Sequence, residues 1–364
     1  MRCSRRGFLA LPALAACSRR GAAYRVYALV ANQDGHAVAA VDLSTLAVAR
    51  HIPLGAAPVQ VVAAGTRGTA YALTPAGGGV HEIRMDRLQF ARKLHVAPTA
   101  SAMHLAADET LLYVLARASR SLSLVALDTF RVAARVPLPE VAAEFAVTPD
   151  GRFAAVSSAE SVRLVDLAAR QVSPPLGRGD YGVVRFLFDG RTLIAADRGA
   201  RRLSLYDVAS ARLITHLPLA VRPDNLCFNY DGGQLFVTGE GMDAVVVVYP
   251  YHTPQIAGTT LAGRAPGAMA ASESLLFVAS AQSGDVSILN IPTRKVIAVV
   301  PVGADPGCVA VTPDDQYALV LNRQSGDVAV LRVGTITPNR YKSAAVLTMI
   351  PVGSRPVSAA FWAV

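Results

Sequence analysis

The stretch from Val147 to Phe153 reads Val-Thr-Pro-Asp-Gly-Arg-Phe and joins two apolar runs. Asp-Gly supplies the positive φ that a tight turn between antiparallel strands requires. A variant without the glycine, Val-Thr-Pro-Asp-Asp-Gln-Tyr, stands at Val311 to Tyr317. Phe188 to Gly190 and Tyr230 to Gly232 give two further Asp-Gly turns. We therefore predict a repeated pair of antiparallel strands around these turns.

The apolar runs before such turns recur about every 40 residues, the length of one four-stranded blade of a β-propeller. They begin near Val59, Ala102, Ala142, Val183, Asn225, Ala268, Cys308 and Val357. In each unit a third strand ends in Asp or Asn, as at Asp166, and a fourth ends as at Val300 to Gly303. The first runs lack clean alternation, as expected for sheets covered on both faces. The pattern predicts an all-β propeller of four-stranded antiparallel blades.

The two ends of the repeat region complement each other. Tyr24 to Leu54 supplies strands two to four of a blade, and seven complete units follow from Val59 to Val352. Val357 to Val364 is again a first strand without partners of its own. Joining it to the N-terminal strands removes the open edges that would invite aggregation. We therefore expect a single domain over residues 24–364 with eight blades, or seven if one degenerate unit, near Thr69 to Val96, is miscounted.

The motif Val-Thr-Pro-Asp-Gly-x-aromatic, then Gly-x-Val-x-Val-Asp, then Val-Gly-x-x-Pro, resembles the YVTN repeat of YncE-type and surface-layer β-propellers. The resemblance covers essentially Tyr24 to Val364, with the best matches at Val147 to Asp166 and Val311 to Leu331. These relatives are usually seven-bladed. Eight blades is the number in the haem-d1 domain of nitrite reductases, which the repeats also resemble at the level of fold. The resemblance implies the fold and says little about function.

Composition excludes several classes of protein. Hydrophobic residues make up 52% of the 364 residues and charged residues 17%, which rules out a disordered chain. No apolar run reaches the roughly 18 residues that would span a bilayer. The net charge of +9 is spread without a block of like charges. That distribution indicates a solvated surface and not a nucleic-acid partner.

The first residues read as an export address. Ser4 to Ala10, Ser-Arg-Arg-Gly-Phe-Leu-Ala, resembles a twin-arginine signal, and Leu14 to Cys17, Leu-Ala-Ala-Cys, resembles a bacterial lipobox. An ordinary cleaved secretory signal is the alternative. The resemblance implies a signal peptide at 1–16, acylation of Cys17 and a short linker at 17–23. We expect a periplasmic lipoprotein held at a bacterial membrane, the outer membrane where the cell has one.

Loops between fourth and first strands, and between second and third strands, share one face of the ring and surround the mouth of the central channel. Rigid scaffolds commonly carry function on such loops. The alternative is that these residues form turns or pair across blades. Guanidinium groups there could hold an anionic ligand through charge-assisted hydrogen bonds. The candidate ligand-binding residues are Arg222, Arg264, Arg355, Asp180, Tyr181, Asp224, Asn225, Asp305, His36 and Glu240.

Three of these candidates, Arg222, Arg264 and Arg355, recur beside a proline in three different repeats. We expect them to occupy comparable positions, to point toward a common axis and to make the potential of the channel mouth positive. Asp180, Asp224 and Asp305 lie in the same class of loop and could neutralise these charges.

The sequence contains no recognisable catalytic or metal-binding set. The histidines lack His-x-His or Glu-x-x-His spacing, so we expect no metal site. His104 lies within a first strand and is the histidine expected nearest the axis, more often a satisfied core residue than a ligand. Cys227 and Cys308 fall two blades apart and are expected to be unbridged and buried.

Two classes of function remain open. The first is a non-enzymatic, membrane-anchored propeller, expected to be a monomer, that binds a small anionic ligand or a protein partner on its channel face without a cofactor. The second is a propeller enzyme, either a lactonase-like hydrolase or a cofactor-dependent oxidoreductase related to haem-d1 propellers. A cluster of Glu160, Glu240 or Asp243 with His36 and Arg222 would favour hydrolysis.

Overall fold

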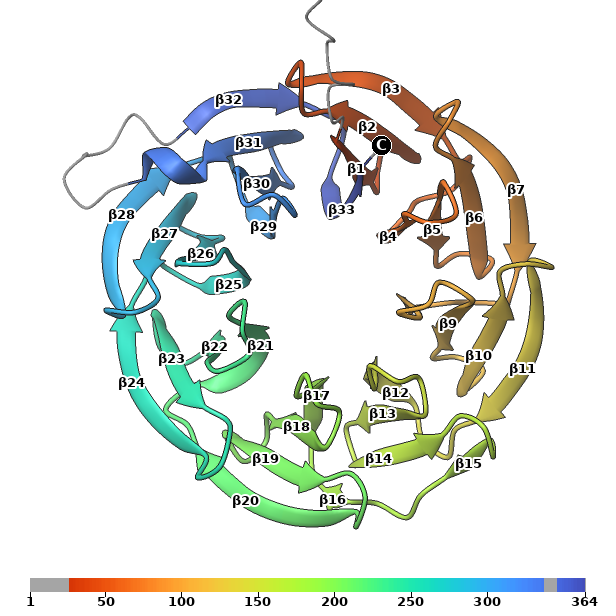
Figure 1. The fold of residues 1–364 in the computed structure, drawn as a ribbon, viewed down its shortest axis with the longest axis vertical. Helices are drawn as coiled ribbons and strands as arrows, with labels where there is room; N and C mark the ends of the chain where they lie inside the picture. The colour runs from red at the N-terminus through yellow and green to blue at the C-terminus, as the bar shows by residue number, and fades with distance from the viewer. Residues whose placement is uncertain (1–25, 337–345, 364) are drawn as a thin grey trace, which may run out of the picture.

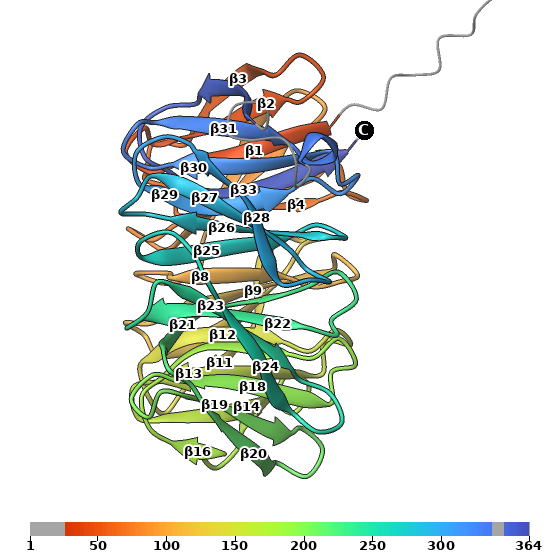
Figure 2. The same cartoon turned by 90° about the vertical axis from the view of Figure 1, so that its left-hand side faces the viewer.

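The computed structural model describes residues 26–336 and 346–363, which form a closed ring of eight antiparallel sheets around a central channel (Figure 1). The first strand of each blade lines the channel and the fourth strand forms the outer rim. Seen from the side, the strands run across the thickness of a disc, so that all turns lie on its two faces (Figure 2). The prediction of an eight-bladed propeller is confirmed.

We number the blades from 1 to 8 and write each from the channel outwards. Blade 1 consists of β33 (Pro356–Ala363), β1 (Val26–Asn32), β2 (Ala37–Asp42) and β3 (Ala47–Pro53), and blade 2 of β4 (Gln60–Ala64), β5 (Thr69–Thr74), β6 (Gly79–Arg84) and β7 (Gln89–His95). Blade 3 consists of β8 (Ala102–Leu105), β9 (Leu111–Ala116), β10 (Ser121–Ala126) and β11 (Arg131–Pro137). Blade 4 consists of β12 (Ala142–Val147), β13 (Phe153–Ser158) and β14 (Ser161–Asp166), with β15 (Gln171–Val172) and β16 (Gly177–Arg178) at its outer edge.

Blade 5 consists of β17 (Tyr181–Phe186), β18 (Thr192–Asp197), β19 (Arg202–Asp207) and β20 (Arg212–Pro218), and blade 6 of β21 (Arg222–Phe228), β22 (Leu235–Glu240), β23 (Ala244–Tyr249) and β24 (Gln255–Leu261). Blade 7 consists of β25 (Pro266–Ala271), β26 (Leu275–Ser280), β27 (Asp285–Asn290) and β28 (Lys295–Pro301). Blade 8 consists of β29 (Pro306–Val311), β30 (Tyr317–Asn322), β31 (Asp327–Arg332) and β32 (Val346–Pro351). Within the described residues the only helical element is the three-residue η1 (Val333–Thr335), so no helix there is long enough to cross a membrane.

The C-terminal strand closes the ring as predicted. β33 pairs antiparallel with β1 from Val26↔Ala363 to Asn32↔Pro356. One face of blade 1 packs on blade 8, where Val30 meets Leu321, and the other on blade 2, where Leu29 meets Val61. The two termini of the described chain are therefore fixed in one sheet, and the ring has no open blade edge toward the channel.

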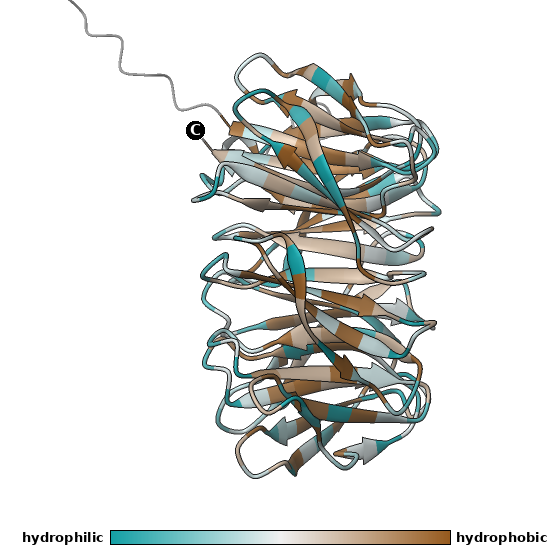
Figure 3. Ribbon diagram, turned by 90° about the vertical axis from the view of Figure 1, so that its right-hand side faces the viewer, coloured by the Kyte–Doolittle hydropathy of each residue, from teal (hydrophilic) through white to brown (hydrophobic). Residues whose placement is uncertain are grey.

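Apolar second and third strands build the core between blades. Ile194 and Leu203 of blade 5, for example, pack with Leu235 and Val237 of blade 6. Hydrophobic segments lie along the strands and hydrophilic ones concentrate at the turns of the two faces (Figure 3). Since every sheet is covered on both sides, the strands carry nearly continuous apolar runs, as the sequence suggests.

The Thr-Pro-Asp turns have the chemistry expected of them. Thr148 Oγ1 donates to Asp150 Oδ1 at 2.6 Å, and the same carboxylate oxygen accepts from the Arg152 amide at 3.1 Å. Gly151 has φ +69°. In the variant turn of blade 8, Asp315 takes up the left-handed conformation at φ +57°. This face is shaped by turn formation, which explains its many aspartates.

Two features differ from the regular repeat. The unit near Thr69 to Val96 forms a complete blade, so its degenerate sequence does not cost a strand. The outer edge of blade 4 is instead divided into β15 and β16. Pro174 and Pro175 lie between these two segments, and proline has no N–H to donate to a strand ladder.

Candidate functional site: the channel mouth

One residue position recurs at the mouth in five blades. It lies where the inner strand begins, beside the end of the second strand of the same blade. In blades 5, 6, 7, 8 and 1 this position is held by Asp180, Arg222, Ala265, Asp305 and Arg355, respectively. The carbonyls of Asp180, Asp305 and Arg355 accept from Arg198, Arg323 and Gln33 at 2.8 to 2.9 Å. Each of these five blades therefore has one pair of facing residues at the rim of the channel.

Three of these facing pairs carry opposite charges. Arg198 Nη2 is 2.8 Å from Asp180 Oδ1, and the same arrangement in blade 8 has Arg323 Nη2 at 2.6 Å from Asp305 Oδ1. Arg323 Nε also donates to Asp305 Oδ2 at 3.0 Å, which makes that pair a bidentate fork. Blade 6 has the signs exchanged, with Arg222 Nη1 at 3.1 Å from Glu240 Oε2.

Glycines make room for the arginine side chains of the pairs in blades 5 and 8. An ideal Cβ on Gly307 would lie 2.3 Å from Arg323 Nε, and one on Gly182 would lie 2.9 Å from Arg198 Cδ. The arginine side chains therefore lie against the inner strand where a larger residue would displace them. Gly267 occupies the corresponding place in blade 7 and has no atom within 4 Å of its Cβ position, because the facing residue there is Ala281.

The three candidate arginines differ from one another. Arg222 is engaged by Glu240 and lies 3.6 Å from Asp180 of the neighbouring blade. Arg355 faces the uncharged Gln33 and forms no ion pair with any described residue. Arg264 is a correction to the expected equivalence, because it lies one residue earlier than Arg222 and Arg355, at a position held by Ala304 in blade 8. Its side chain is exposed and likewise has no ionic partner within the described residues.

A cavity of about 650 Å³ opens between blades 8 and 1 at this face. Arg355 and the Asp305–Arg323 fork lie on its wall, together with Asp34, whose carboxylate forms no ion pair with any residue of 26–336 or 346–363. Its remaining lining residues are Gln324, Ser325, Gly326, Pro351, Gly353 and Ser354. Small and polar groups thus surround one unneutralised guanidinium, and this is the only place at which the described mouth combines an unpaired candidate arginine with a defined cavity.

The other sequence candidates are placed in different ways. Tyr181 is only 1% exposed, and its hydroxyl is 2.9 Å from that of Tyr206, so it is a core residue and not a mouth residue. Asp224 and Asn225 lie on β21 and are half-buried. His36 is exposed in the turn between β2 and β1 of blade 1, while Glu240 belongs to blade 6. Because these two side chains lie on separate, non-adjacent blades, His36 and Glu240 do not form the acid–histidine cluster that would favour hydrolysis.

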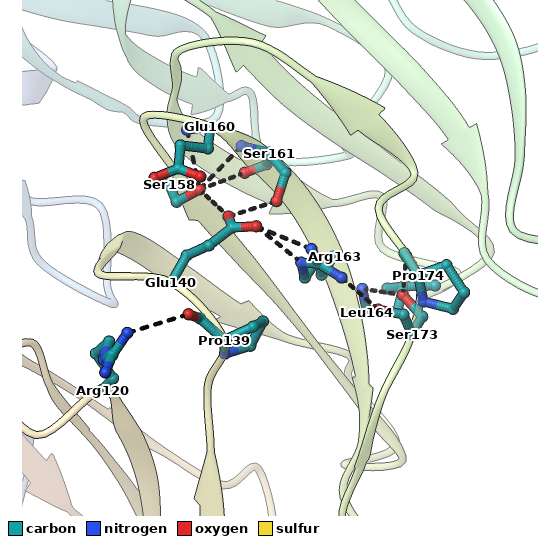
Figure 4. A network of polar contacts seen from close by, with 10 residues as sticks. All are labelled: Arg120, Pro139, Glu140, Ser158, Glu160, Ser161, Arg163, Leu164, Ser173 and Pro174. Atoms are coloured by element: carbon teal, nitrogen blue, oxygen red, sulfur yellow. Dashed lines mark hydrogen bonds and ion pairs between the residues drawn. The ribbon is translucent and has the colours of Figure 1, made fainter.

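Blade 4 contains a polar network that the sequence pattern does not predict. Glu140 precedes β12, and its carboxylate accepts from Ser158 Oγ and, at 2.6 Å, from Ser161 Oγ (Figure 4). Arg163 Nη2 completes it at 2.9 Å. The network ties the entry to β12 to the turn between β13 and β14. Glu140 lies among Ala and Pro in the sequence, and its three partners follow at 18 to 23 residues, so no local pattern reveals them.

His104 reaches the channel as expected but is not a satisfied core histidine. Its side chain is exposed, and its ring lies near the rings of Tyr113 and Phe145, each at 6.5 Å between centroids. Desolvation of the ring by the surrounding protein lowers the pKa of His104, and the positive charge of Arg185 lowers this pKa further. The imidazole is therefore neutral at physiological pH.

Cys227 and Cys308 are unbridged, and burial raises the pKa of each thiol to about 11. Both are therefore protonated and unreactive at neutral pH. Across residues 26–336 and 346–363 no group of three or more His, Cys, Asp or Glu side chains is placed to hold a metal ion.

Comparison with known proteins agrees on the architecture. The chain has the fold of an eight-bladed β-propeller. It is similar to apo AztD from Citrobacter koseri (TM-score 0.71, 13% identity, covering 93% of this chain and 98% of that one). It is also similar to the dihydro-haem d1 dehydrogenase NirN in complex with DHE (TM-score 0.70, 12% identity, 90% and 73% covered).

A third structure, hydrazine synthase from Kuenenia stuttgartiensis, aligns with a TM-score of 0.59 at 18% identity, over 77% of this chain and 96% of that one. The sequence matches no protein-family model and no curated protein. At these identities the likeness concerns the fold, which hosts proteins of varied function.

Proposed function

We propose that this chain is an exported, lipid-anchored propeller of the YVTN type that binds a small anionic ligand at its channel mouth without transforming it. The observation that carries the proposal is Arg355, a guanidinium without an ionic partner among the described residues, on the wall of a cavity of about 650 Å³. The charged residues at the equivalent position in blades 5, 6 and 8 each form an ion pair with the facing side chain, whereas Arg355 does not.

The cavity offers further donors beside Arg355. Nε and Nη2 of Arg323 are held by Asp305, which leaves Nη1 directed to no described residue. Ser325 Oγ and Gln324 lie on the same wall. Asp34 opposes a highly charged anion, so the site fits a ligand with one or two negative charges and hydroxyl or amide groups. Charge-assisted hydrogen bonds of this kind are worth about 1.5–3 kcal/mol each.

Replacing Arg355 by Gln tests the proposal. Titration of the purified protein with inorganic phosphate, acetate and citrate should show at least one of them binding, and Arg355→Gln should weaken that binding about tenfold or more, because one charge-assisted contact is lost. Arg264→Gln is the matched control, since it removes an equally exposed arginine of the same face outside the cavity. Equal weakening in both variants would show that only the general field of the face matters.

The lipid anchor is tested separately, because Cys17 lies outside the described residues. Cys17→Ser should move the protein from the membrane fraction to the soluble periplasmic fraction, since the thiol that would carry the acyl chains is gone. Immunoblotting of fractionated cells that produce either form measures this. Retention of the serine variant in the membrane would contradict the lipoprotein assignment and leave the binding proposal standing.

A further inference from the structure

The wall of the central channel is arranged in levels that the strand register defines. Each inner strand pairs with the second strand of its blade, and inner-strand residues at the same height along the channel form one level. One such level lies opposite equivalent second-strand residues, which are Leu29, Tyr71, Tyr113, Ala155, Ile194, Phe236, Phe277 and Leu319. That level consists of Ala360, Val62, His104, Ala146, Arg185, Cys227, Ala270 and Ala310. Most of these side chains are small, so the channel is wide there.

Side chains of this level border the channel, and in blades 3, 5 and 8 the next residue along the inner strand is buried. Val184, Met103 and Val309 belong to the level above and are 0, 2 and 8% exposed. Arg185 is half-buried and His104 is exposed. Successive side chains of a strand point to opposite sides, so alternate levels line the channel and the levels between them pack between blades.

Arg185 is the one permanently charged member of its level. Its only hydrogen bond within the described residues runs from Nη1 to the Val184 carbonyl at 2.8 Å, and it forms no ion pair there. Arg185 of blade 5 and His104 of blade 3 line the same cavity, although blade 4 lies between their blades, so the arginine side chain borders the channel. Glu144, two levels nearer the mouth, likewise has no ion pair among the described residues.

A cavity of about 570 Å³ lies against this part of the wall. Arg185, His104 and Glu144 supply its polar groups, and Val147, Leu187 and Phe188 supply an apolar end. The Phe188 ring is 51% exposed and stands edge-on to Phe228 at 5.4 Å. Gln60 also borders the cavity, but its amide is already bonded to the backbone of Met103 at 2.8 Å in both directions. Gln60 is therefore a structural bridge between β4 and β8.

We propose that this cavity is a second binding site, which we call the channel-wall site, for a molecule with a single anionic group held by Arg185 and an apolar, preferably aromatic, body against Val147, Leu187 and Phe188. The site is distinct from the mouth cavity: the two share no lining residue and lie on different blades. The proposal therefore does not rest on ligand binding at Arg355.

The wall itself selects this chemistry. The unpaired guanidinium attracts an anionic group, and the neutral imidazole of His104 can donate or accept one hydrogen bond beside it. Glu144 repels a second negative charge and so limits the ligand to one. The exposed Phe188 ring gains most when a flat apolar surface removes it from water.

Two fluorescent probes with nearly the same body test the channel-wall site. 8-Anilinonaphthalene-1-sulfonate carries one sulfonate, and N-phenyl-1-naphthylamine carries none. We expect the folded wild-type protein to bind the sulfonate probe, and Arg185→Gln to weaken that binding about tenfold or more. The same variant should change binding of the neutral probe by less than about threefold, since its apolar contacts remain.

Arg264→Gln removes an exposed arginine that lines neither cavity, so it is the matched control and should leave the sulfonate probe unaffected. Glu144→Gln is an independent second variant, expected to bind the sulfonate probe more tightly because a repelling charge is removed. If Arg185→Gln does not fold, binding of the sulfonate probe by Glu144→Gln tests the channel-wall site by itself. The proposal is overturned if wild-type protein binds no sulfonate probe, if Arg185→Gln loses both probes equally or neither, or if Glu144→Gln binds the sulfonate probe more weakly.

Discussion

A chain that ends at Arg355, and so lacks β33, should be insoluble or should melt at least about 10 °C below the wild type. β33 supplies the inner strand of blade 1 and contributes to the clusters on both of its faces, through Phe361 toward blade 8 and Trp362 toward blade 2. Without it, β1 becomes an open edge that faces the channel. Solubility and thermal melting measured by circular dichroism check this expectation.

A chain that ends at Trp362 is the control for that deletion. It loses the single pair Val26↔Ala363 and keeps the rest of the β33–β1 ladder, so its melting temperature should change little. An unchanged melting temperature in the chain that ends at Arg355 would mean that the ring does not depend on its closing strand.

Replacing Glu140 by Ala should lower the free energy of unfolding by about 3 kcal/mol, because Arg163 is then left partly buried without its carboxylate. The side chains of Glu140 and Arg163 are 16 and 20% exposed, which is well below the exposure of the ion pairs at the mouth. Ser158 and Ser161 lose their acceptor in the same change. Denaturant unfolding measures the difference, and a loss below about 1 kcal/mol would contradict the structural role of this network.

The pH dependence of that network has a definite sign. Burial raises the pKa of Glu140, but hydrogen bonds from Ser158, Ser161 and Arg163 outweigh it, and the net pKa lies below the ordinary value. The network therefore stabilises the fold fully above the pKa of the unfolded chain, about 4.3. Its contribution is lost as the pH falls through the lower folded pKa. Glu140→Gln should consequently lose less stability than the wild type between pH 6 and pH 3, and an equal loss would argue against this source.

Much of the fold follows from local sequence signals. The turns at Thr148 and Thr312 are fixed by side-chain hydrogen bonds within five residues, so a short motif is enough to reveal them. Closure follows from strand arithmetic, because an unpaired first strand at one end complements three strands at the other. The degenerate unit near Thr69 does not disturb the count, since burial between two neighbouring blades maintains its strands.

The site is harder to predict because it depends on register across the ring. Arg264 and Arg355 both stand near a proline, but a shift of one residue puts them at different positions on the rim. Tyr181 follows Asp180 directly, yet it points into the core while Asp180 stays at the mouth. Arg185 lies within an apolar run of the sequence, and a lone arginine in a strand covered on both sides is itself a signal that one side chain faces water.

Native mass spectrometry of the full-length protein, purified from its own cells without denaturation, tests ligand binding at the mouth most directly. We expect a wild-type species heavier than the same protein after denaturation by one small anionic molecule, and the loss of that species in Arg355→Gln but not in Arg264→Gln. A bound molecule that persists equally in all three proteins, or a native wild-type mass equal to that of the denatured protein, would contradict ligand binding at the mouth.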